Sequence, residues 1–377
     1  MVALTHPAVV GRGHMGRPSR RRRSSITIAD VAREAGVSAM TVSRVINGVQ
    51  NVRDSTRAAV LDAVEKLNYS PNSAARSLAA GEAIHVGLLY ANPSAGYLSQ
   101  FVIGALYAAR GVGAHLLIES CESEDADEQA EVTRRFANGE VEGVILPPPL
   151  SESQPILAEL EAIGMPVVTV AMGTPNEDAL NVRIDDRAAA AEMTQHLLDL
   201  GHRRIGFIKG HPNHIASHDR FRGFCDAMRD FGLDPDEMPV EQGYFSYRSG
   251  LTAGERLLAR GEAPTAIFAS NDDMAAATIS VAHRLGLNVP DDISIVGFDD
   301  TALATSVWPE LTTVKQPIAS MAEAALELLV ADLRGHRAGA PHKGTERVLS
   351  HAIIIRESSG PPPSGRRGRS RKPANEA

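Results

Sequence analysis

The chain has 377 residues, of which 43% are hydrophobic, and a formal net charge of −8 at pH 7. This length predicts two or three domains with sizeable cores. Because no apolar run reaches 18 residues and no apolar signal-peptide core is present, we expect neither a membrane span nor export, and therefore a cytoplasmic protein.

The charge is distributed unevenly along the chain. Residues 1–80 hold 12 Arg and Lys against 5 Asp and Glu, a net +7, and residues 361–377 hold 5 against 1, a net +4. The segment between them therefore carries a net −19. A basic N-terminal region on an acidic body indicates a DNA-binding protein with a separate sensor domain.

Residues 1–25 contain six Arg and no acidic residue, without hydrophobic periodicity. They are expected to form a disordered basic arm. The segment is either a solvated tail or an arm on the DNA backbone, and its position before the next domain favours the arm. Gly11–Gly16 fits G-x-G-x-x-G, but Pro18 follows where a helix should begin, so we reject dinucleotide binding.

Residues 26–70 have the pattern of three short helices. Thr27 and Ser38 are candidate N-caps of the first two, and Gly36 can adopt the positive φ of the turn between them. Apolar residues at helical spacing define the inward face of this domain: Ile28, Val31, Ala32, Ala35, Val42, Val45, Ile46, Val60, Val64 and Leu67. The pattern predicts a helix-turn-helix domain, whose second helix reads the major groove of DNA.

This pattern alone leaves open a helical hairpin packed in another kind of domain. Residues 27–32, 36–38 and 41–47 read TIADVA, GVS and TVSRVIN, and residues 67–72 and 75–79 read LNYSPN and ARSLA. These motifs resemble the signatures of the lactose-repressor/galactose-repressor (LacI/GalR) family, and the resemblance continues to about Glu357. It implies a ligand-responsive transcriptional regulator, a repressor rather than an activator, that binds a pseudo-palindromic DNA operator as a homodimer.

The DNA contacts are expected from the second helix and from a hinge. Ala39 and Met40 should set base preference, and Arg44 should contact a base or phosphate. In residues 71–81 the resemblance implies a hinge that becomes helical on DNA, with Leu78 wedged into the minor groove. The full set of expected DNA-binding residues is Thr27, Ser38, Ala39, Met40, Thr41, Ser43, Arg44, Asn47, Asn72, Ala75 and Leu78.

From residue 84 short apolar runs alternate with helical patterns, which predicts parallel sheets with helices on both faces. Strands are expected at 85–90, 115–119, 143–146, 167–170, 205–209, 266–270 and 293–298, and helices at 186–200, 219–231 and 272–285. These strands are too many for one compact sheet, so we expect two lobes. The resemblance implies that residues 82–359 form a periplasmic-binding-protein-like α/β body for effector binding and dimerisation. The chain should cross between lobes near Asp185, Thr313 and Gly339.

The second lobe carries most of the expected effector-binding residues. Arg220 lies in a stretch matching the family's S-x-x-R-x-x-G, where the resemblance implies that it holds ligand hydroxyls or a carboxylate. Asn271 and Asp299 follow expected strands and can bond hydroxyl groups. A surface position remains the alternative for Arg220. Asp272 can cap the following helix, and its role and that of Asp300 stay open.

An aromatic residue and the first lobe complete the expected effector site. Phe245 either stacks on the ligand, as the resemblance implies, or packs in the core. In the first lobe the loop from Asn92 departs from the family pattern, and Asn92 with Tyr97 or Ser99 is expected to line the cleft. Residues 171–173 lack the Asp that many relatives carry after the fourth strand. A sugar or sugar derivative is expected as effector over a purine, without a particular sugar.

Other functions are disfavoured by the motifs. Paired carboxylates occur only at adjacent positions, which cannot serve as a glycosidase pair, and no nucleophile elbow or phosphate loop is present. The two histidines of His211-Pro212-Asn213-His214 lack a third metal ligand nearby. We therefore expect no enzyme, cofactor or metal site. A transport binding protein fits the body but not the N-terminal domain.

The remaining features concern the C-terminus and the cysteines. Residues 360–377 are expected to form a disordered basic tail. This tail lacks the leucine heptads with which some relatives join two dimers, which favours a dimer. Cys121 and Cys225 are expected to be reduced, buried thiols.

Overall fold

The computed structural model describes residues 28–46, 53–67, 84–173 and 178–363. The chain forms two compact units that divide at residue 72. The N-terminal arm, the hinge and most of the C-terminal tail lie outside the described residues, as do Thr27, Asn47, Asn72, Ala75 and Leu78. The roles expected for these segments and residues therefore stay predictions.

The first unit is a three-helix domain with α1 (Ile28–Glu34), α2 (Ala39–Ile46) and α3 (Asp54–Lys66). Gly36 has a φ of +65° between the first two helices. The Ser38 hydroxyl accepts a hydrogen bond from the Thr41 backbone N–H at 3.2 Å, which confirms the expected cap. The core includes the expected apolar residues of all three helices except Ile46, whose side chain lies outside the description, and Val31, Val42 and Val60 are fully buried.

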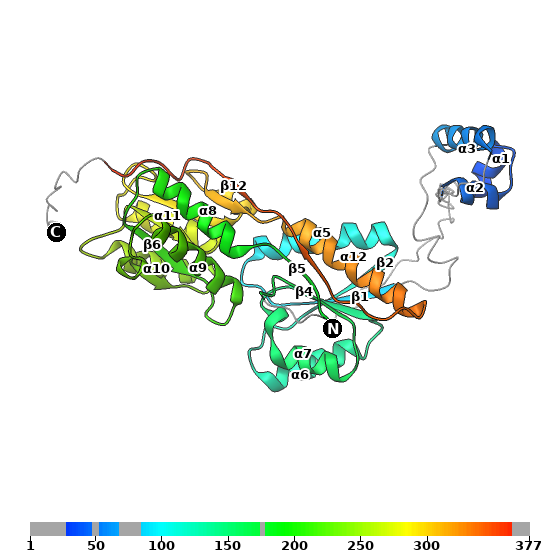
Figure 1. The fold of residues 1–377 in the computed structure, drawn as a ribbon, viewed down its shortest axis with the longest axis horizontal. Coiled ribbons are helices and arrows are strands. Elements are labelled where there is room, and N and C mark those ends of the chain that lie inside the picture. Colours follow the sequence, from blue (N-terminus) through cyan, green and yellow to red (C-terminus); the bar gives the residue numbers. More distant parts are fainter. Residues whose placement is uncertain (1–27, 47–52, 68–83, 174–177, 364–377) are drawn as a thin grey trace, which may run out of the picture. The chain divides into compact units, whose positions relative to one another are not determined.

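The second unit has two lobes, each a six-stranded sheet between helices (Figure 1). The first sheet is wholly parallel, in the order β11-β5-β4-β3-β1-β2. Its strands are β1 (Ile84–Tyr90), β2 (Ala114–Ser120), β3 (Gly143–Leu146), β4 (Val167–Val170), β5 (Leu180–Arg183) and β11 (Thr345–Val348). Helices α5 (Ala95–Val112) and α12 (Ile318–Arg337) cover one face, and α6 (Ala126–Ala137) and α7 (Gln154–Ala162) cover the other.

The second sheet has the order β12-β10-β9-β8-β6-β7, with only β12 antiparallel to its neighbour. Its strands are β6 (Ile205–Lys209), β7 (Val240–Gln242), β8 (Ala266–Ala269), β9 (Ser294–Asp299), β10 (Thr312–Lys315) and β12 (Ala352–Ile354). Helices α8 (Asp186–Asp199) and α9 (Ile215–Asp230) pack together, as do α10 (Tyr247–Leu258) and α11 (Asp272–Arg284). Short 3-10 turns lie at Leu150–Glu152, Pro235–Glu237 and Ala302–Thr305.

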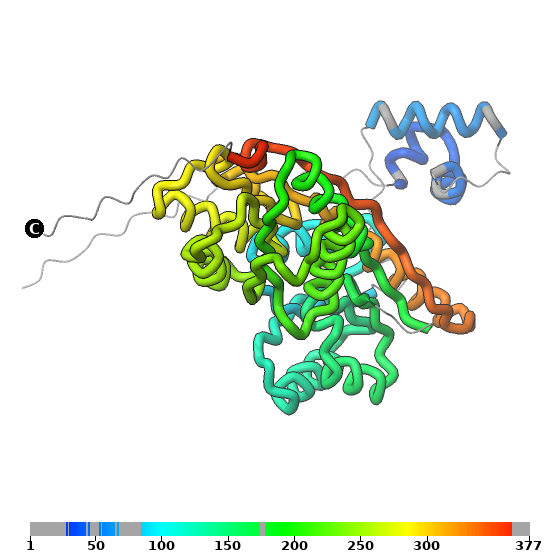
Figure 2. Tube along the Cα trace, turned by 60° about the vertical axis from the view of Figure 1, so that its left-hand side comes forward, coloured from blue at the N-terminus to red at the C-terminus, as the bar shows by residue number. Residues whose placement is uncertain are grey.

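The chain passes between the lobes three times (Figure 2). The first crossing separates β5 from α8 and agrees with the expected place near Asp185. The second follows Lys315 rather than Thr313, because β10 continues to that residue. The third lies at residues 349–351 and not at Gly339, so that prediction was wrong. Gly339 has a positive φ just after α12, but the chain then adds β11 to the first sheet before it crosses.

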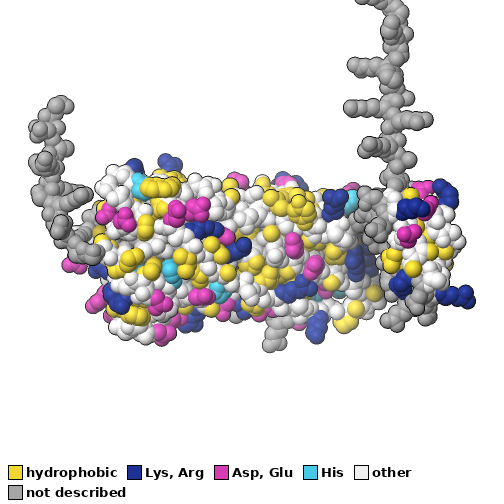
Figure 3. Space-filling model, turned by 90° about the horizontal axis from the view of Figure 1, so that it is seen from above, with side chains coloured by type: hydrophobic (Ala, Val, Ile, Leu, Met, Phe, Trp, Pro, Cys, Tyr) yellow, Lys and Arg dark blue, Asp and Glu magenta, His cyan; other side chains and the backbone are white. Residues whose placement is uncertain are grey.

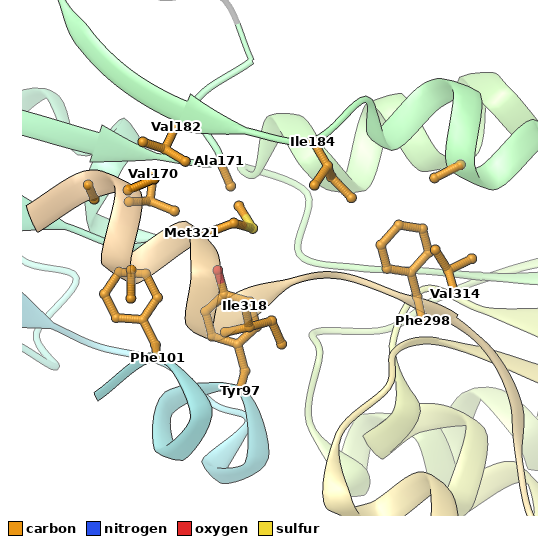
Figure 4. Close-up of a cluster of buried hydrophobic side chains, with 14 of the residues drawn as sticks. Tyr97, Phe101, Val170, Ala171, Val182, Ile184, Phe298, Val314, Ile318 and Met321 are labelled. Atoms are coloured by element: carbon orange, nitrogen blue, oxygen red, sulfur yellow. The ribbon is translucent and has the colours of Figure 1, made fainter. Parts of the chain in front are cut away.

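One hydrophobic cluster runs from the first lobe into the second (Figure 4). Tyr97 and Phe101 of α5 and Met321 of α12 lie on the first-lobe side, while Phe298 and Val314 come from β9 and β10. Cys121 and Cys225 are both buried and free, as expected. Within the described segments, no helix has the length and apolar character needed to cross a membrane.

The close packing of α5 on α12 yields a stability prediction. A Cβ at Gly104 would lie 2.3 Å from the Ala319 carbonyl oxygen, a backbone atom that cannot turn away. Gly104→Ala should therefore lower the free energy of unfolding by about 1–3 kcal/mol. Urea unfolding of the full chain measures this change.

Gly111 of the same helix supplies the matched control. A Cβ there meets no described atom within 4 Å. Gly111→Ala should therefore leave stability unchanged or raise it by up to about 1 kcal/mol, because alanine is the better helix former. Equal unfolding midpoints for the two variants would contradict the packing argument.

Candidate functional site

The second helix of the first unit presents an exposed polar and apolar face. Ala39, Met40 and Arg44 are all exposed, and 67% of Met40 is accessible to solvent. Thr41 is half-buried and its hydroxyl lies 2.9 Å from that of Ser38, so it serves the helix cap. Ser43 lies in the same helix.

Arg44 differs from two other basic residues of this unit, Arg33 and Lys66. Arg33 pairs with Asp30 at 3.0 Å, and Lys66 pairs with Glu34 at 2.6 Å. Arg44 forms no ion pair with any described residue, although it lies on the exposed face of α2. Its guanidinium is therefore available to an anionic or hydrogen-bonding partner such as DNA.

A small cavity of about 50 Å³ lies between the lobes of the second unit. Six of the seven expected effector residues line it, namely Asn92, Tyr97, Arg220, Phe245, Asn271 and Asp299. Ser99 does not line it and is exposed, so that alternative to Tyr97 was wrong. Two residues on in a helix point about 200° further round the axis, which turns Ser99 away when Tyr97 points inward.

Arg220 is held rigidly in the second turn of α9. Its Nε donates to Asp186 Oδ1 at 2.8 Å, and its Nη1 donates to the Ser270 carbonyl oxygen. The guanidinium carbon lies 3.7 Å from the centre of the Phe298 ring, and only 5% of Arg220 is exposed. The surface alternative for Arg220 is therefore wrong. Its Nη2 donates to no described residue, which leaves this group for a ligand.

Two buried carboxylates flank this guanidinium. Asp186 accepts from Nε, and Asp299 Oδ1 lies 3.7 Å from Nη1. Burial raises the pKa of both carboxyl groups above their usual range, while Arg220 acts in the opposite direction. Gln316 Nε2 also donates to Asp299 at 2.6 Å.

His214 lies on the same wall of the cavity and is uncharged. Burial and the neighbouring His211 and Arg220 lower the pKa of His214 to about 3. Arg220 is therefore the one cation among the residues that line this cavity.

Backbone strain is concentrated at the cavity. Among the described residues, the non-glycine positions with positive φ are Ala171 (58°), Phe245 (58°), Asp299 (117°) and Asp300 (57°). Three of them line the cavity, and the fourth follows one of the three. Such strain is tolerated where the surrounding fold holds side chains for a function, which marks this cavity as a binding site.

Tyr97 carries a buried hydroxyl without a hydrogen-bond partner among the described residues. Its ring stacks on Phe101 with a centroid distance of 6.3 Å, and the residue lines the cavity. An unpartnered buried hydroxyl costs about 1–3 kcal/mol, so such groups usually receive a partner. A ligand in the cavity can supply it.

The structure reassigns the acidic and amide residues after β8 and β9. Asn271, not Asp272, caps α11, with Oδ1 accepting from the Met274 N–H at 3.0 Å. Asp272 instead accepts from Thr301 and Thr313 inside the second lobe. Asp300 accepts from Arg356 at 2.6 Å outside the cavity. Asp272 and Asp300, whose roles the sequence left open, therefore have structural roles. Asn271 both caps α11 and lines the cavity.

Several lining residues had no clear signal in the sequence: Pro93, Ser94, Pro148, Glu152, Ala171, His214, Ala216 and Gln316. Gln316 follows β10, a strand that the apolar pattern did not predict because it reads TTVK. His214 belongs to the histidine pair considered for metal binding. The described residues contain no group of side chains suited to a metal ion.

Hydrogen bonds join the lobes across the cleft. The Ser94 hydroxyl donates to Asp273 Oδ2 at 2.6 Å, and the Ile215 N–H donates to the Glu152 carboxylate at 3.0 and 3.2 Å. Gln100 Nε2 donates to the Asp300 carbonyl oxygen at 3.2 Å. Burial raises the pKa of Glu152 from its usual 4.5 to about 7.

Comparison with known proteins agrees with both units. Residues 27–72 match the model of bacterial regulatory proteins of the lacI family, and residues 194–359 match a periplasmic binding protein-like domain. Catabolite control protein A of Priestia megaterium is 35% identical over 81% of this chain and 92% of its own length.

Two solved structures share the fold. The transcriptional regulator CelR in complex with cellobiose has a TM-score of 0.68 and 31% identity, covering 89% of this chain and all of its own. The lac repressor dimer bound to operator and an anti-inducer has a TM-score of 0.65 and 27% identity over the same shares. Because both the N-terminal three-helix domain and the two-lobed body match, the chain belongs to the LacI family of bacterial regulatory proteins.

Proposed function

We propose that this protein is a repressor that binds a pseudo-palindromic operator as a homodimer and is controlled by an uncharged sugar in the interlobe cavity. The proposal of a ligand rests on the Tyr97 hydroxyl, which is buried and has no partner among the described residues. Tyr97 lines the same cavity as Arg220, whose Nη2 donates to no described residue. The exposed face of α2 carries the DNA part, since Arg44 forms no ion pair there with a described residue.

The charge of the cavity favours a neutral ligand. Arg220 already faces two carboxylates, Asp186 and Asp299, and His214 is uncharged. A phosphate or carboxylate on the ligand would find no cation that is not already paired. Sugar hydroxyls can instead accept from Arg220 Nη2 and Tyr97 and donate to Asp299.

A purine is the alternative effector. Phe245 offers restricted room for base stacking, because His214 already stacks on its ring at a centroid distance of 5.7 Å. The CelR relative, whose solved structure contains cellobiose, also supports a sugar.

A dimer is supported by exposed apolar side chains on the first lobe. Ile103, Leu106 and Tyr107 of α5 follow a helical spacing and are 50%, 49% and 70% exposed, and Ile118 lies on the edge strand β2.

On the face of the body seen in Figure 3, acidic side chains are spread among basic ones, which disfavours DNA contact there.

Control of DNA binding would follow from closure of the cleft. A sugar that contacts both lobes favours the closed arrangement by its differential affinity for the two states. The change is passed to residues 71–81, the expected hinge, in each subunit. Operator affinity then changes by the same coupling free energy with which the operator affects sugar binding.

The DNA part is tested at Arg44. Arg44→Ala should weaken operator binding by about 1–3 kcal/mol, because a base or phosphate contact is lost. Operator sites selected from random DNA and measured by fluorescence anisotropy provide the test. Arg33→Ala, which removes a residue paired with Asp30, is the matched control and should have a smaller effect. Equal losses in both variants would contradict the assignment.

The ligand part is tested at Tyr97. Tyr97→Phe should weaken sugar binding by about 0.5–1.5 kcal/mol while leaving the ligand-free protein as stable or more stable, because only an unpaired hydroxyl is removed. Calorimetric titration and thermal unfolding measure the two effects, with sugars, sugar phosphates and purines as ligands. Arg220→Ala is a poorer test, since it leaves two buried carboxylates without a cation. Binding of a sugar phosphate in preference to its sugar would refute the charge argument.

Glu152 yields a pH prediction. Its pKa rises from 4.5 to about 7 on folding, so the folded protein binds the extra proton and stability falls as pH increases through this interval. Glu152→Gln retains an oxygen to accept from the Ile215 N–H but cannot titrate. We expect the variant to lose stability less steeply between pH 4.5 and 7 in urea unfolding. Parallel pH profiles would show that Glu152 is not buried in this way.

A further inference from the structure

The interlobe cleft continues outward from the cavity at Arg220 into a second, wider chamber of about 880 Å³. Asn92, Pro93, Glu152 and His214 line both chambers, so the two are continuous. Binding pockets for single small molecules measure about 300–1,000 Å³. The outer chamber alone is near the upper end of this range, whereas the inner chamber is small. The cleft therefore has room for more than one sugar ring.

Four rings form a continuous wall from the inner chamber to the outer one. Phe245 lies in the inner chamber, and His214 stacks on it at 5.7 Å. His211 stacks on His214 at 4.5 Å, and Tyr244 meets His211 edge-on at 5.5 Å. Tyr244 is 48% exposed and lines the outer chamber. Aromatic surface of this kind packs well against the apolar C–H faces of sugar rings.

The wall also carries hydrogen-bonding groups that the protein does not use. Neither ring nitrogen of His214 bonds to a described residue, so a neutral imidazole offers one donor and one acceptor where the chambers meet. His211 Nδ1 accepts from the Asn213 N–H at 3.2 Å, which places the proton of the neutral ring on Nε2. That Nε2 lies 3.9 Å from Glu124 Oε1 of the opposite lobe.

The charge of the outer chamber continues that of the inner one. Its lining includes Glu122, Glu124 and Glu152, and no Lys or Arg. A phosphate at this end of a ligand would be repelled. Gln129 and Ser153 add neutral polar groups from the first lobe. The chamber thus combines an aromatic wall, uncharged polar groups and carboxylates, which suits a polyhydroxylated, uncharged unit.

We propose that the outer chamber is a second sugar subsite and that the effector is an oligosaccharide of two or more units. The first unit occupies the chamber at Arg220 and Tyr97, and the next lies along His214, His211 and Tyr244. This inference rests on the proposed sugar effector, and it adds the length of the ligand and the residues that read it. The second unit contacts both lobes, because Glu124 and Gln129 face His211 and Tyr244 across the chamber.

Matched pairs of sugars test the inference on the full-length protein. Calorimetric titration is carried out with glucose and cellobiose, glucose and maltose, and galactose and lactose. In at least one pair the disaccharide should bind about 10-fold more tightly than the monosaccharide, a difference of about 1.4 kcal/mol. Tyr244→Ala and His211→Ala should each remove most of that advantage and leave monosaccharide affinity within about twofold, since the inner chamber is unchanged.

Phe231→Ala is the matched control. Phe231 is an exposed aromatic residue at the end of α9 that lines neither chamber and lies under Arg203. This variant should bind both sugars of a pair as the unmodified protein does.

The outcomes separate this inference from the proposed function. If a monosaccharide binds as tightly as its disaccharide, or if Tyr244→Ala weakens both equally, the second subsite is refuted while the sugar effector stands. If no sugar of any pair binds a preparation that still binds operator, the sugar effector fails and the second subsite fails with it.

Discussion

The effector cleft depends on one buried guanidinium. Arg220 extends from α9 to Asp186 at the start of α8, to the Ser270 carbonyl after β8 and to Asp299 at the end of β9. It thereby ties together two helices and two strand ends of the second lobe. Because parallel strands direct their carboxyl ends to one edge of a sheet, these groups meet on the side that faces the first lobe. The guanidinium organises the site and still has one nitrogen free for a ligand.

Several features around this centre indicate a ligand-binding site. The Tyr97 hydroxyl lacks a partner, and positive φ angles are held at Ala171, Phe245 and Asp299. The lobes share one hydrophobic cluster and are joined across the cleft at Ser94–Asp273 and Glu152–Ile215. A molecule bound between them therefore acts on contacts that also set the closure of the lobes, which is the coupling that a ligand-controlled regulator needs.

The sequence predicted elements well where its pattern had a single physical reading. The core of the three-helix domain contains the apolar residues predicted for it, apart from Ile46. Strands β3, β4 and β6 have the expected bounds because each is a buried apolar run between polar turns. Five strands were not predicted. Among them, β11 is largely exposed and β10 reads TTVK, so neither has the hydrophobic pattern of a core strand. They are strands because neighbouring strands supply their hydrogen bonds. β11 pairs with β5, which is distant in the sequence, and β10 lies between β9 and β12.

By itself, the sequence determined the family and the two-part organisation, because local motifs and hydrophobic patterns specify them. It also identified six of the residues that line the cavity, from family motifs and from their positions at strand ends. Only the tertiary structure decided what those residues do. Asn271 took the cap position for which Asp272 was a candidate and still lines the cavity, whereas Asp272 bonds to Thr301 and Thr313. Ser99 turned outward with its helix. His214, Glu152 and Gln316 entered the site because segments from both lobes converge there. Their burial, partners and protonation arise from contacts between residues far apart in the chain, which no local pattern encodes.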